Sequence, residues 1–174
     1  MAYKQAAELE VRPATRNDVP LILQFIQELA EYEQLAHEVV ATPELLREQL
    51  FGPAPTGGGA EVIIAYLAEQ PVGFALFFHN FSTFLGRRGI YLEDLYVKPA
   101  YRGHGIGRTL LIYLARLAQT RGCGRLEWSV LNWNETAIRF YRSLGARPLT
   151  EWTGFRLTGT ALDELAAETS AAAR

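Results

Sequence analysis

The sequence predicts a mixed α/β fold of the α+β type, with a central, mostly antiparallel sheet of about six to seven strands flanked by helices. Strand-type runs at 61–68, 72–81 and 90–97 are joined by short turns, which favours an antiparallel meander. Apolar residues recur at helical spacing over 19–29 and 106–117, which predicts two amphipathic helices. A chain of 174 residues suits a single domain, so residues 1–174 are predicted to share one core.

Composition and charge narrow the classes of function. The chain is 49% hydrophobic and 21% charged with a net charge of −2, which gives no support for a nucleic-acid partner. Its one cysteine, Cys123, allows no disulfide within the chain and favours a reducing compartment. No apolar run reaches ~18 residues, and the N-terminal residues lack the apolar region of a secretory signal. We therefore expect a cytoplasmic protein without a membrane span.

The N-terminal half begins with a short strand at 9–12. Thr15 and Asp18 have the spacing of a capping box, which predicts that the first helix begins there. Thr42 followed by Pro43 predicts the start of a second helix. The glycine- and proline-rich residues 53–59 are predicted to form a loop rather than a domain linker.

The C-terminal part is predicted to contain a strand at 125–131 and then a helix. Asn134 can cap this helix, and Gly145 lies where a glycine commonly ends one. Short strands are expected at 147–150 and 155–158. The alanine-rich tail from residue 161 is predicted to be helical and to fray after Glu168.

The most informative segment joins the strand at 90–97 to the helix that follows. Residues 102–107 read R-G-H-G-I-G, so glycines alternate through the turn immediately before a helix starts. The segment matches neither the P-loop nor the dinucleotide-binding pattern, because Arg108 stands where each requires another residue. Glycines let the backbone approach an anion closely, and N–H groups at a helix start attract it. The turn therefore predicts a site for a phosphate-bearing ligand.

With its neighbours, this turn resembles the pyrophosphate loop of the GNAT N-acetyltransferase superfamily. E-L-A-E-Y-E (28–33), Y-L-E-D-L-Y-V (91–97), W-N-E (133–135) and F-Y-R-S-L-G-A (140–146) are similar to the diamine acetyltransferase branch, which includes spermidine/spermine and thialysine acetyltransferases. The resemblance covers most of the chain and is weakest at 52–62 and after residue 146. It implies acetyl transfer from acetyl-CoA, without a metal, by direct attack of a small primary amine in a ternary complex. It also implies a homodimer, to which apolar strands near the C-terminus could contribute.

The same resemblance assigns the residues that bind the coenzyme. The main chain of 95–97 would hold the pantetheine arm like an added strand, and residues 102–107 would hold the diphosphate. Asn134 would contact the coenzyme from the next helix, although capping that helix is a sufficient alternative role. The complete set implied is Leu95, Tyr96, Val97, Arg102, Gly103, His104, Gly105, Ile106, Gly107, Asn134 and Thr136.

The catalytic residues implied are Glu93 and Tyr141. Glu93 would accept the proton of the amine through water, and Tyr141 would protonate the departing thiolate. Strand alternation predicts that Glu93 and Asp94 point to opposite faces, with Ile90, Leu92 and Tyr96 beside Asp94. Both carboxylates could instead be paired with nearby arginines, and Tyr141 could be a core aromatic.

The residues implied at the acceptor site are Tyr32, Glu33, Glu93, Asp94, Glu127 and Trp128. Each has a structural alternative, such as a helix end, an arginine pair or a core position. The chain departs from the spermidine/spermine pattern at residues 152–155, where W-T-G-F lacks two expected glutamates. A long polycation would lose an anionic anchor there, so a shorter diamine or an amino acid with a side-chain amine becomes the better substrate.

Other residue types point to no further chemistry. His37, His79 and His104 do not have the spacing of metal ligands, and Cys123 has no obvious base partner in the sequence. Two alternatives to a small-molecule enzyme remain open from the sequence. One is an acetyltransferase of the same fold that modifies a protein amine, and the other is a non-catalytic module that binds coenzyme A.

Overall fold

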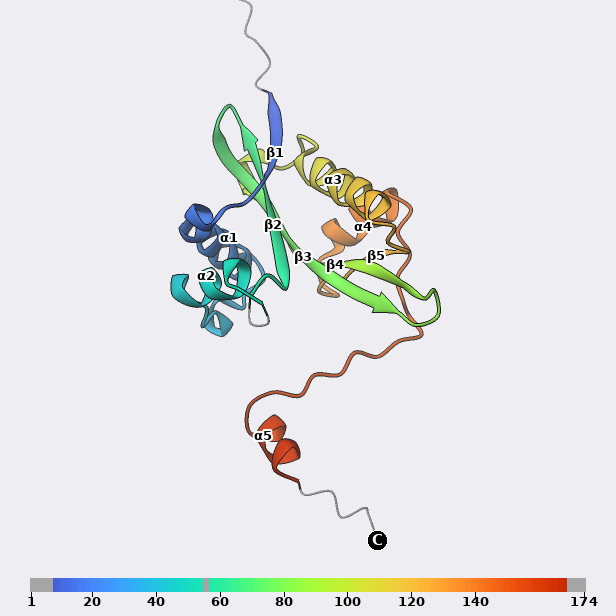
Figure 1. Ribbon diagram of the computed structural model, residues 1–174. Helices are drawn as coiled ribbons and strands as arrows, with labels where there is room; N and C mark the ends of the chain where they lie inside the picture. Colours follow the sequence, from blue (N-terminus) through green and yellow to red (C-terminus); the bar gives the residue numbers. More distant parts are fainter. Residues whose placement is uncertain (1–7, 55–56, 169–174) are drawn as a thin grey trace, which may run out of the picture. The chain divides into compact units, whose positions relative to one another are not determined.

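The computed structural model describes residues 8–54 and 57–168. These residues form two compact units, one within Met1–Leu131 and one within Asn132–Arg174. The larger unit is built around a sheet, and the smaller one contains two short helices (Figure 1). In the part of the chain described, no helix has the length and apolar character needed to cross a bilayer.

The sheet of the first unit has five strands in the order β1-β2-β3-β4-β5. All neighbours pair antiparallel except β4 and β5, which run parallel. The strands are β1 (Leu9–Pro13), β2 (Ala60–Leu67), β3 (Gln70–Ser82), β4 (Arg87–Val97) and β5 (Leu126–Trp128). The predicted meander is therefore confirmed, and β5 is shorter than expected because it pairs only with residues 90–92 of β4.

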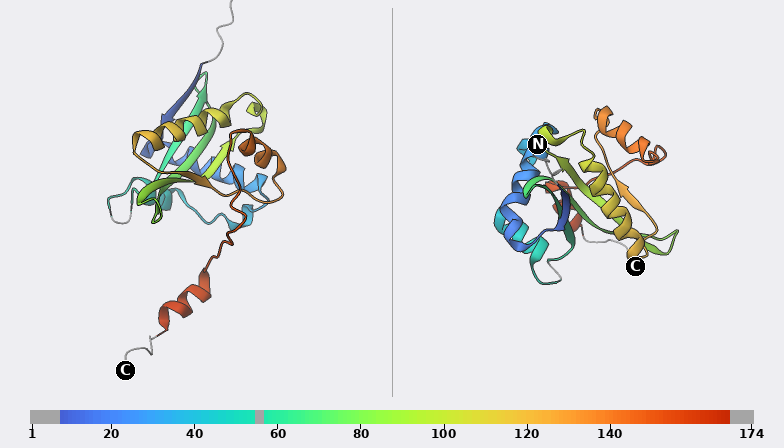
Figure 2. Two further views of the ribbon diagram at one scale, coloured as in Figure 1. Left: turned by 90° about the vertical axis from the view of Figure 1, so that its right-hand side faces the viewer. Right: turned by 90° about the horizontal axis from the view of Figure 1, so that it is seen from above.

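Three helices cover the two faces of this sheet. They are α1 (Val19–Tyr32), α2 (Pro43–Phe51) and α3 (Ile106–Thr120), with 3₁₀ turns at Arg16–Asp18, Ala36–Glu38 and Pro99–Tyr101. The right-hand view of Figure 2 shows α1 and α2 on one face and α3 on the other. The predicted caps are confirmed: the Asp18 carboxylate accepts from the Thr15 N–H at 2.7 Å, and Thr42 Oγ1 accepts from the Leu45 N–H.

Each face of the sheet has its own apolar core. On the α1/α2 face, Phe25 stacks on Phe74 with ring centroids 5.2 Å apart, and Tyr96 packs against Phe25. On the α3 face, fully buried residues of the sheet meet the apolar stripe of the helix, and they include Ile63, Phe77, Ile90, Leu92, Leu110 and Leu114. Two separate cores on one sheet hold its strands firmly, so groups at the strand ends are well positioned.

A β-bulge interrupts β4 at Glu93. Leu76 pairs with Asp94 and Phe77 pairs with Leu92, so Glu93 is an extra residue without a partner in the register. The bulge shifts the alternation of side chains along β4, so the prediction that Ile90 and Leu92 share a face with Asp94 is wrong. Asp94 does share a face with Tyr96, but the buried residues Ile90 and Leu92 lie on the α3 face.

The second unit contains α4 (Glu135–Ser143) and α5 (Gly159–Ala167). Asn134 Oδ1 accepts from the Ala137 N–H at 3.2 Å, which confirms the predicted cap of α4. Gly145 follows this helix with φ +86°, a left-handed conformation that glycine adopts without strain. The predicted tail helix is confirmed as α5, and residues beyond 168 lie outside the described residues.

The strands predicted at 147–150 and 155–158 do not form, so the sheet has fewer strands than the sequence suggested. The apolar side chains of this segment lie in solvent, with Trp152 71% and Phe155 95% exposed. A strand needs a neighbour for its backbone and a surface for its apolar side chains. Within this unit the segment 147–158 has neither.

Candidate active site

The turn between β4 and α3 has the geometry of an anion-binding cradle. Gly103 and Gly105 have φ near +80°, and a Cβ built on either would have no atom within 4 Å. The N–H groups of residues 103–108 have no backbone acceptor among the described residues, whereas the Thr109 N–H reaches the Gly105 carbonyl. Such a run of free donors at the start of a fifteen-residue helix attracts a negatively charged group.

The end of β4 adds an open sheet edge to this cradle. Because the Lys98 N–H points to Val72 on β3, the Val97 carbonyl points away from β3. By strand alternation, the N–H and C=O groups of Leu95 and Val97 both face the other side, and those of Tyr96 face β3. Strand β5 stops before this point, so within the first unit the edge at 95–97 has no strand beside it. This edge can pair with an extended ligand.

The two polar side chains of the turn fold back onto the protein. Arg102 Nε donates to the Val97 carbonyl at 2.9 Å, and its guanidinium carbon lies 4.4 Å from the centre of the Tyr32 ring. His104 Nδ1 lies 2.9 Å from the Arg102 carbonyl. The backbone of the turn, more than these side chains, therefore provides the donors of the cradle.

A group of carboxylates lies on the α1/α2 face beside the bulge. Burial, together with the nearby charges of Glu93 and Glu33, raises the pKa of Asp94 to about 6. Burial also raises the pKa of Glu33, which follows the last residue of α1. Neither Asp94 nor Glu33 has an ion-pair partner among the described residues. A cation would relieve the repulsion between these like charges.

Glu127 on β5 has a different environment from those carboxylates. It accepts a hydrogen bond from Asn80 Nδ2, and its Oε2 lies 2.8 Å from Arg125 Nε. The Nε–H does not point at the carboxylate, so this contact is an ion pair rather than a hydrogen bond. Arg125 Cγ passes over Gly89, where an added Cβ would be 2.8 Å away. This network joins the short β5 to β3 across β4.

The structure brings together most, but not all, of the predicted acceptor residues. Tyr32 and Glu33 lie at the C-terminal end of α1, where the charge of Glu33 acts on Asp94. The register of β4 with β5 places Glu127 on the same face of the sheet as Asp94. Trp128 pairs with Leu92 and therefore lies on the opposite, α3 face. Strand alternation alone separates Glu127 from Trp128, but the bulge decides which of the two shares a face with Asp94, and the sequence does not predict the bulge.

The remaining predicted residues belong to the second unit. Asn134 caps α4, and Thr136 is exposed in the first turn of that helix. Tyr141 is partly buried on the same helix, and its ring centroid is 5.4 Å from that of Phe140. Asn134 caps α4, and Thr136 and Tyr141 lie within its first two turns. The positions of these three residues relative to one another are therefore fixed by one short helix.

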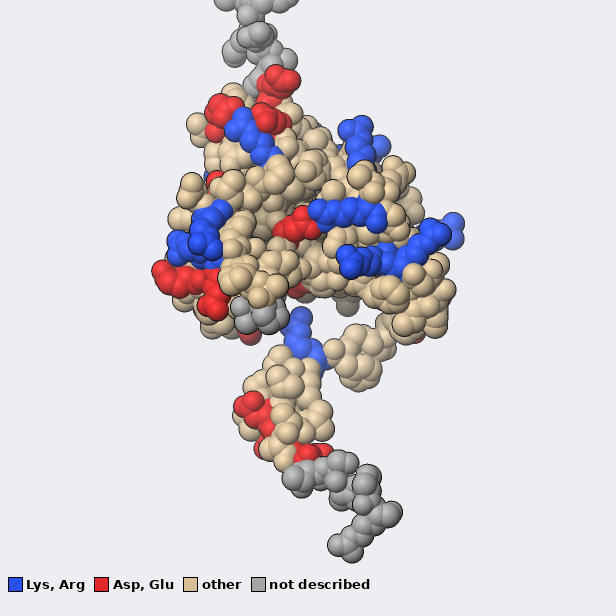
Figure 3. Space-filling model, in the orientation of Figure 1, with Lys and Arg blue, Asp and Glu red and all other residues tan. Residues whose placement is uncertain are grey.

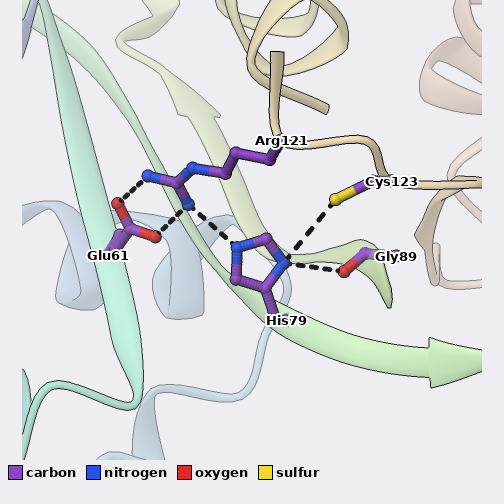
Figure 4. A network of polar contacts seen from close by, with 5 residues as sticks. All are labelled: Glu61, His79, Gly89, Arg121 and Cys123. Carbon is purple, nitrogen blue, oxygen red and sulfur yellow. Dashed lines mark hydrogen bonds and ion pairs between the residues drawn. The ribbon is translucent and has the colours of Figure 1, made fainter. Parts of the chain in front are cut away.

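A second charged cluster lies on the α3 face (Figure 4). Arg121, just after α3, forms two contacts with the Glu61 carboxylate and donates to His79 Nε2 at 3.0 Å. His79 Nδ1 lies 3.0 Å from the Gly89 carbonyl and 3.8 Å from Cys123 Sγ. Both imidazole nitrogens are therefore engaged, and no base is free to activate Cys123.

Charges of both signs are interspersed over the face seen in Figure 3. Among residues 8–54 and 57–168, no group of three or more His, Cys, Asp or Glu side chains could hold a metal ion. His37 and His104 are exposed in separate loops, and His79 belongs to the α3-face cluster.

The anion cradle and the open strand edge both lie within a segment that matches a known protein family. Residues 24–146 match the model of the acetyltransferase (GNAT) family. The chain belongs to the GNAT acetyltransferases. It is therefore an acetyltransferase, and acetyl-CoA is the acetyl donor that this family implies. The N–H groups of the cradle and the open edge of β4 suit the diphosphate and the pantetheine arm of that donor.

Curated relatives resemble this GNAT protein over nearly its full length. A thialysine N-epsilon-acetyltransferase of Sus scrofa is 41% identical over 92% of this chain and 98% of that protein. An L-ornithine N5-acetyltransferase of Arabidopsis thaliana is 33% identical over 89% of this chain and 86% of its own length. Among solved structures, an integron cassette protein of V. cholerae superimposes with a TM-score of 0.76, at 29% identity and with 92% and 98% of the two chains covered.

The sequence analysis gave an arginine pair as a structural alternative for Glu127, and the structure shows that pair, but the analysis named neither Arg125 nor Asn80 as the partners. Arg125 and Glu127 are two residues apart on a strand, and this spacing could have indicated that they share a face. The contact with Asn80 could not be predicted, since it depends on strand order. The bulge at Glu93 has no signal in the sequence, because its neighbours read as an uninterrupted strand.

Proposed function

We propose that this acetyltransferase transfers the acetyl group of acetyl-CoA to the side-chain primary amine of a small molecule, with an amino acid such as thialysine, lysine or ornithine preferred over a long polyamine. The observation that carries the proposal is the group of carboxylates around Asp94, which lies unpaired beside the open edge of β4. The relatives named for thialysine and ornithine support the same substrate class, since both molecules are amino acids with a side-chain amine.

The chemistry of amines explains why carboxylates are needed. An alkyl ammonium has a pKa near 10.4, so only about one molecule in 10³ is neutral at pH 7.4, which corresponds to about 4 kcal/mol. Carboxylates attract the ammonium ion and accept its proton, directly or through water. The pKa of Asp94, raised to about 6, is close to the value that suits a base at neutral pH. Family resemblance favours Glu93, the bulged residue, for the same role.

The donor side of the reaction would be handled mainly by the backbone. The N–H groups of residues 103–108 would bind the diphosphate, and the groups of Leu95 and Val97 would pair with the pantetheine arm. Acetyl-CoA supplies an activated thioester carbonyl that an amine can attack. A backbone N–H at the bulge near Glu93 could polarise that carbonyl, since the bulge disturbs the regular pairing of β4 at this point.

We assign the acid that protonates the thiolate to Tyr141. A phenol has a pKa near 10 and a thiol near 8.5, so the transfer is uphill by about 2 kcal/mol and must be coupled to product formation. Asn134 and Thr136 lie on the first turn of the same helix and would contact the coenzyme with it. Tyr32, Glu33, Glu127 and Trp128 stay predictions for the acceptor side, although Trp128 needs an approach from the α3 face.

The proposal extends to the organisation of the whole chain. The family match at 24–146 crosses the boundary between the two compact units, which supports a single functional domain over residues 1–174. The exposed apolar side chains of 149–165 support a homodimer in which this segment of one copy is covered by the other. Such a dimer would act in the cytoplasm.

The decisive experiment measures thiol release from acetyl-CoA with a panel of amines: thialysine, lysine, ornithine, putrescine, spermidine and a lysine peptide. We expect kcat/KM to be highest for the amino acids and lowest for spermidine and the peptide. A preference for the peptide would instead indicate a protein acetyltransferase.

Two controls make that panel interpretable. Binding of coenzyme A, measured by calorimetry, tests the cradle without any amine. Binding without thiol release for every amine would indicate a non-catalytic module and would contradict the proposal. Gel filtration at micromolar concentration tests the homodimer, which a monomeric elution volume would disprove.

A further inference from the structure

Arg102 contacts three parts of the site with one side chain. It begins the glycine turn, its Nε donates to the carbonyl of Val97 at the end of the open edge, and its guanidinium lies over the ring of Tyr32, the last residue of α1. The guanidinium carbon is also 5.6 Å from the centre of the Tyr96 ring. The side chain thus reaches away from the cradle and onto the α1/α2 face.

The contacts of Arg102 join the donor side of the site to its acceptor side. Tyr32 is followed directly by Glu33, whose charge acts on Asp94. The second contact of Arg102 is its hydrogen bond to the carbonyl of Val97, which lies on the strand edge that would pair with the pantetheine arm. A guanidinium is planar and can stack on an aromatic ring while it donates from Nε, which a lysine ammonium cannot do.

We propose that Arg102 is a positioning residue that couples the binding of coenzyme A to the binding of the amine. This inference rests on the proposed function, because it needs both ligands to bind where that function places them. A diphosphate in the cradle fixes the backbone of 102–107, and a pantetheine arm fixes the edge at Val97. Both restrain the guanidinium, which then restrains Tyr32 and the carboxylate of Glu33. Occupation of one site therefore prepares the other.

Thermodynamic linkage makes this coupling measurable. If coenzyme A raises the affinity for an amine by some factor, the amine raises the affinity for coenzyme A by the same factor. Calorimetry gives that factor from the Kd of coenzyme A alone and in saturating thialysine, where no acetyl group is present and no reaction occurs. We expect the wild-type protein to bind coenzyme A about three- to ten-fold more tightly with the amine.

Two pairs of variants test the two contacts. Arg102→Lys keeps the charge but loses the stack and the Nε donor, so the coupling factor should fall to near one. Tyr32→Leu removes the ring and should have the same effect, whereas Tyr32→Phe keeps the ring and should retain the coupling. Arg121→Met is the matched control, because it removes a guanidinium that contacts Glu61 and His79 on the α3 face. It should leave the coupling factor unchanged.

The outcomes separate this inference from the proposed function. A coupling factor near one in the wild-type protein, or an unchanged factor in Arg102→Lys, would overturn the role of Arg102 while leaving acetyl transfer intact. The same holds if Tyr32→Leu retains full coupling, and this variant decides the question should Arg102→Lys fail to fold. If the wild-type protein binds no coenzyme A, the proposed function itself fails, and the inference fails with it.

Discussion

The two faces of the sheet carry charged clusters of opposite character. On the α3 face, the Arg121 guanidinium pairs with Glu61 and donates to His79, and it lowers the pKa of the Glu61 carboxyl. On the α1/α2 face, Asp94 lies near Glu93 and Glu33, and burial together with their charges raises its pKa to about 6. In the first cluster the positive charge of Arg121 balances the negative charge of Glu61, whereas the second cluster contains only negative charges.

This difference indicates which cluster has a function beyond the fold. A balanced cluster holds strands and helix ends together and needs no further partner. Like charges held close together on a partly buried surface destabilise the folded state, and such groups concentrate at binding and catalytic sites. Cys123 illustrates the point: it is a nucleophilic residue type, but it lies in the balanced cluster, where His79 is already engaged. Perturbing the two clusters separately tests this distinction.

The largest effect is expected from removing the carboxylates near the bulge. Asp94→Asn and Glu93→Gln each keep the size of the side chain but remove its charge, and the one that acts as base should lose about 10²–10⁴-fold in kcat/KM. Steady-state thiol release with thialysine measures this loss. Arg121→Met, in the balanced cluster, is the matched control and should change kcat/KM less than about three-fold. Equal losses at all three positions would abolish the distinction between the clusters.

Tyr141→Phe tests whether the carboxylates are sufficient for the chemistry. In the proposed mechanism the phenol is needed only when the thiolate departs, so kcat should fall about 10²-fold while KM for either substrate changes little. Turnover near the wild-type rate would remove Tyr141 from the mechanism. The neighbouring ring of Phe140 provides a comparison, because Phe140→Leu alters the packing of α4 without removing a hydroxyl group.

The pH dependence of the free energy of unfolding should reveal the cost of ionising Asp94 in the folded protein. Its pKa is near 3.9 when unfolded and about 6 when folded, so between these values the folded state binds more protons. Stability is therefore lost as the pH rises from 4 to 6, and Asp94→Asn should be more stable by about 2 kcal/mol above pH 6. Urea unfolding at pH 4 and pH 8 measures this. A gain of the same size at both values would rule out titration of Asp94 as its cause.

Disrupting the balanced cluster should lower stability rather than activity. Arg121→Met leaves Glu61 without its cation and His79 Nε2 without its donor, and we expect a loss of about 1 kcal/mol, since these side chains are partly exposed. That loss corresponds to a decrease in Tm of about 2–4 °C. An unchanged Tm would mean that this cluster contributes nothing to the fold.

The smallest effect is expected at Cys123. Cys123→Ser should leave kcat within about two-fold of wild type, because the thiol has no free base beside it and the acyl transfer that we propose is direct. Activity after treatment with a thiol-specific alkylating reagent offers a second measurement, with Cys123→Ser as the protected control. Loss of acetyl transfer in a folded serine variant would contradict direct transfer and would indicate a covalent intermediate on Cys123.

The sequence by itself determined most of the helices and strands and the glycine turn that we propose binds the acetyl donor. Helix starts at Thr15 and Thr42, the cap at Asn134 and the glycine turn at 102–107 were all predictable, because caps and left-handed glycines depend on residues close in the chain. The antiparallel meander followed from short turns between strand-type runs. Local interactions decide such features, so local sequence reveals them.

Only the tertiary structure decided how the residues proposed for the acceptor side are arranged. The bulge at Glu93 places Asp94 on the α1/α2 face and leaves Ile90 and Leu92 on the other, and the contact of Arg102 with Tyr32 joins residues seventy positions apart. The segment 147–158 has the pattern of strands but finds no neighbour within its own unit. Register, strand pairing and contacts between distant elements depend on packing partners, and a linear pattern does not contain them.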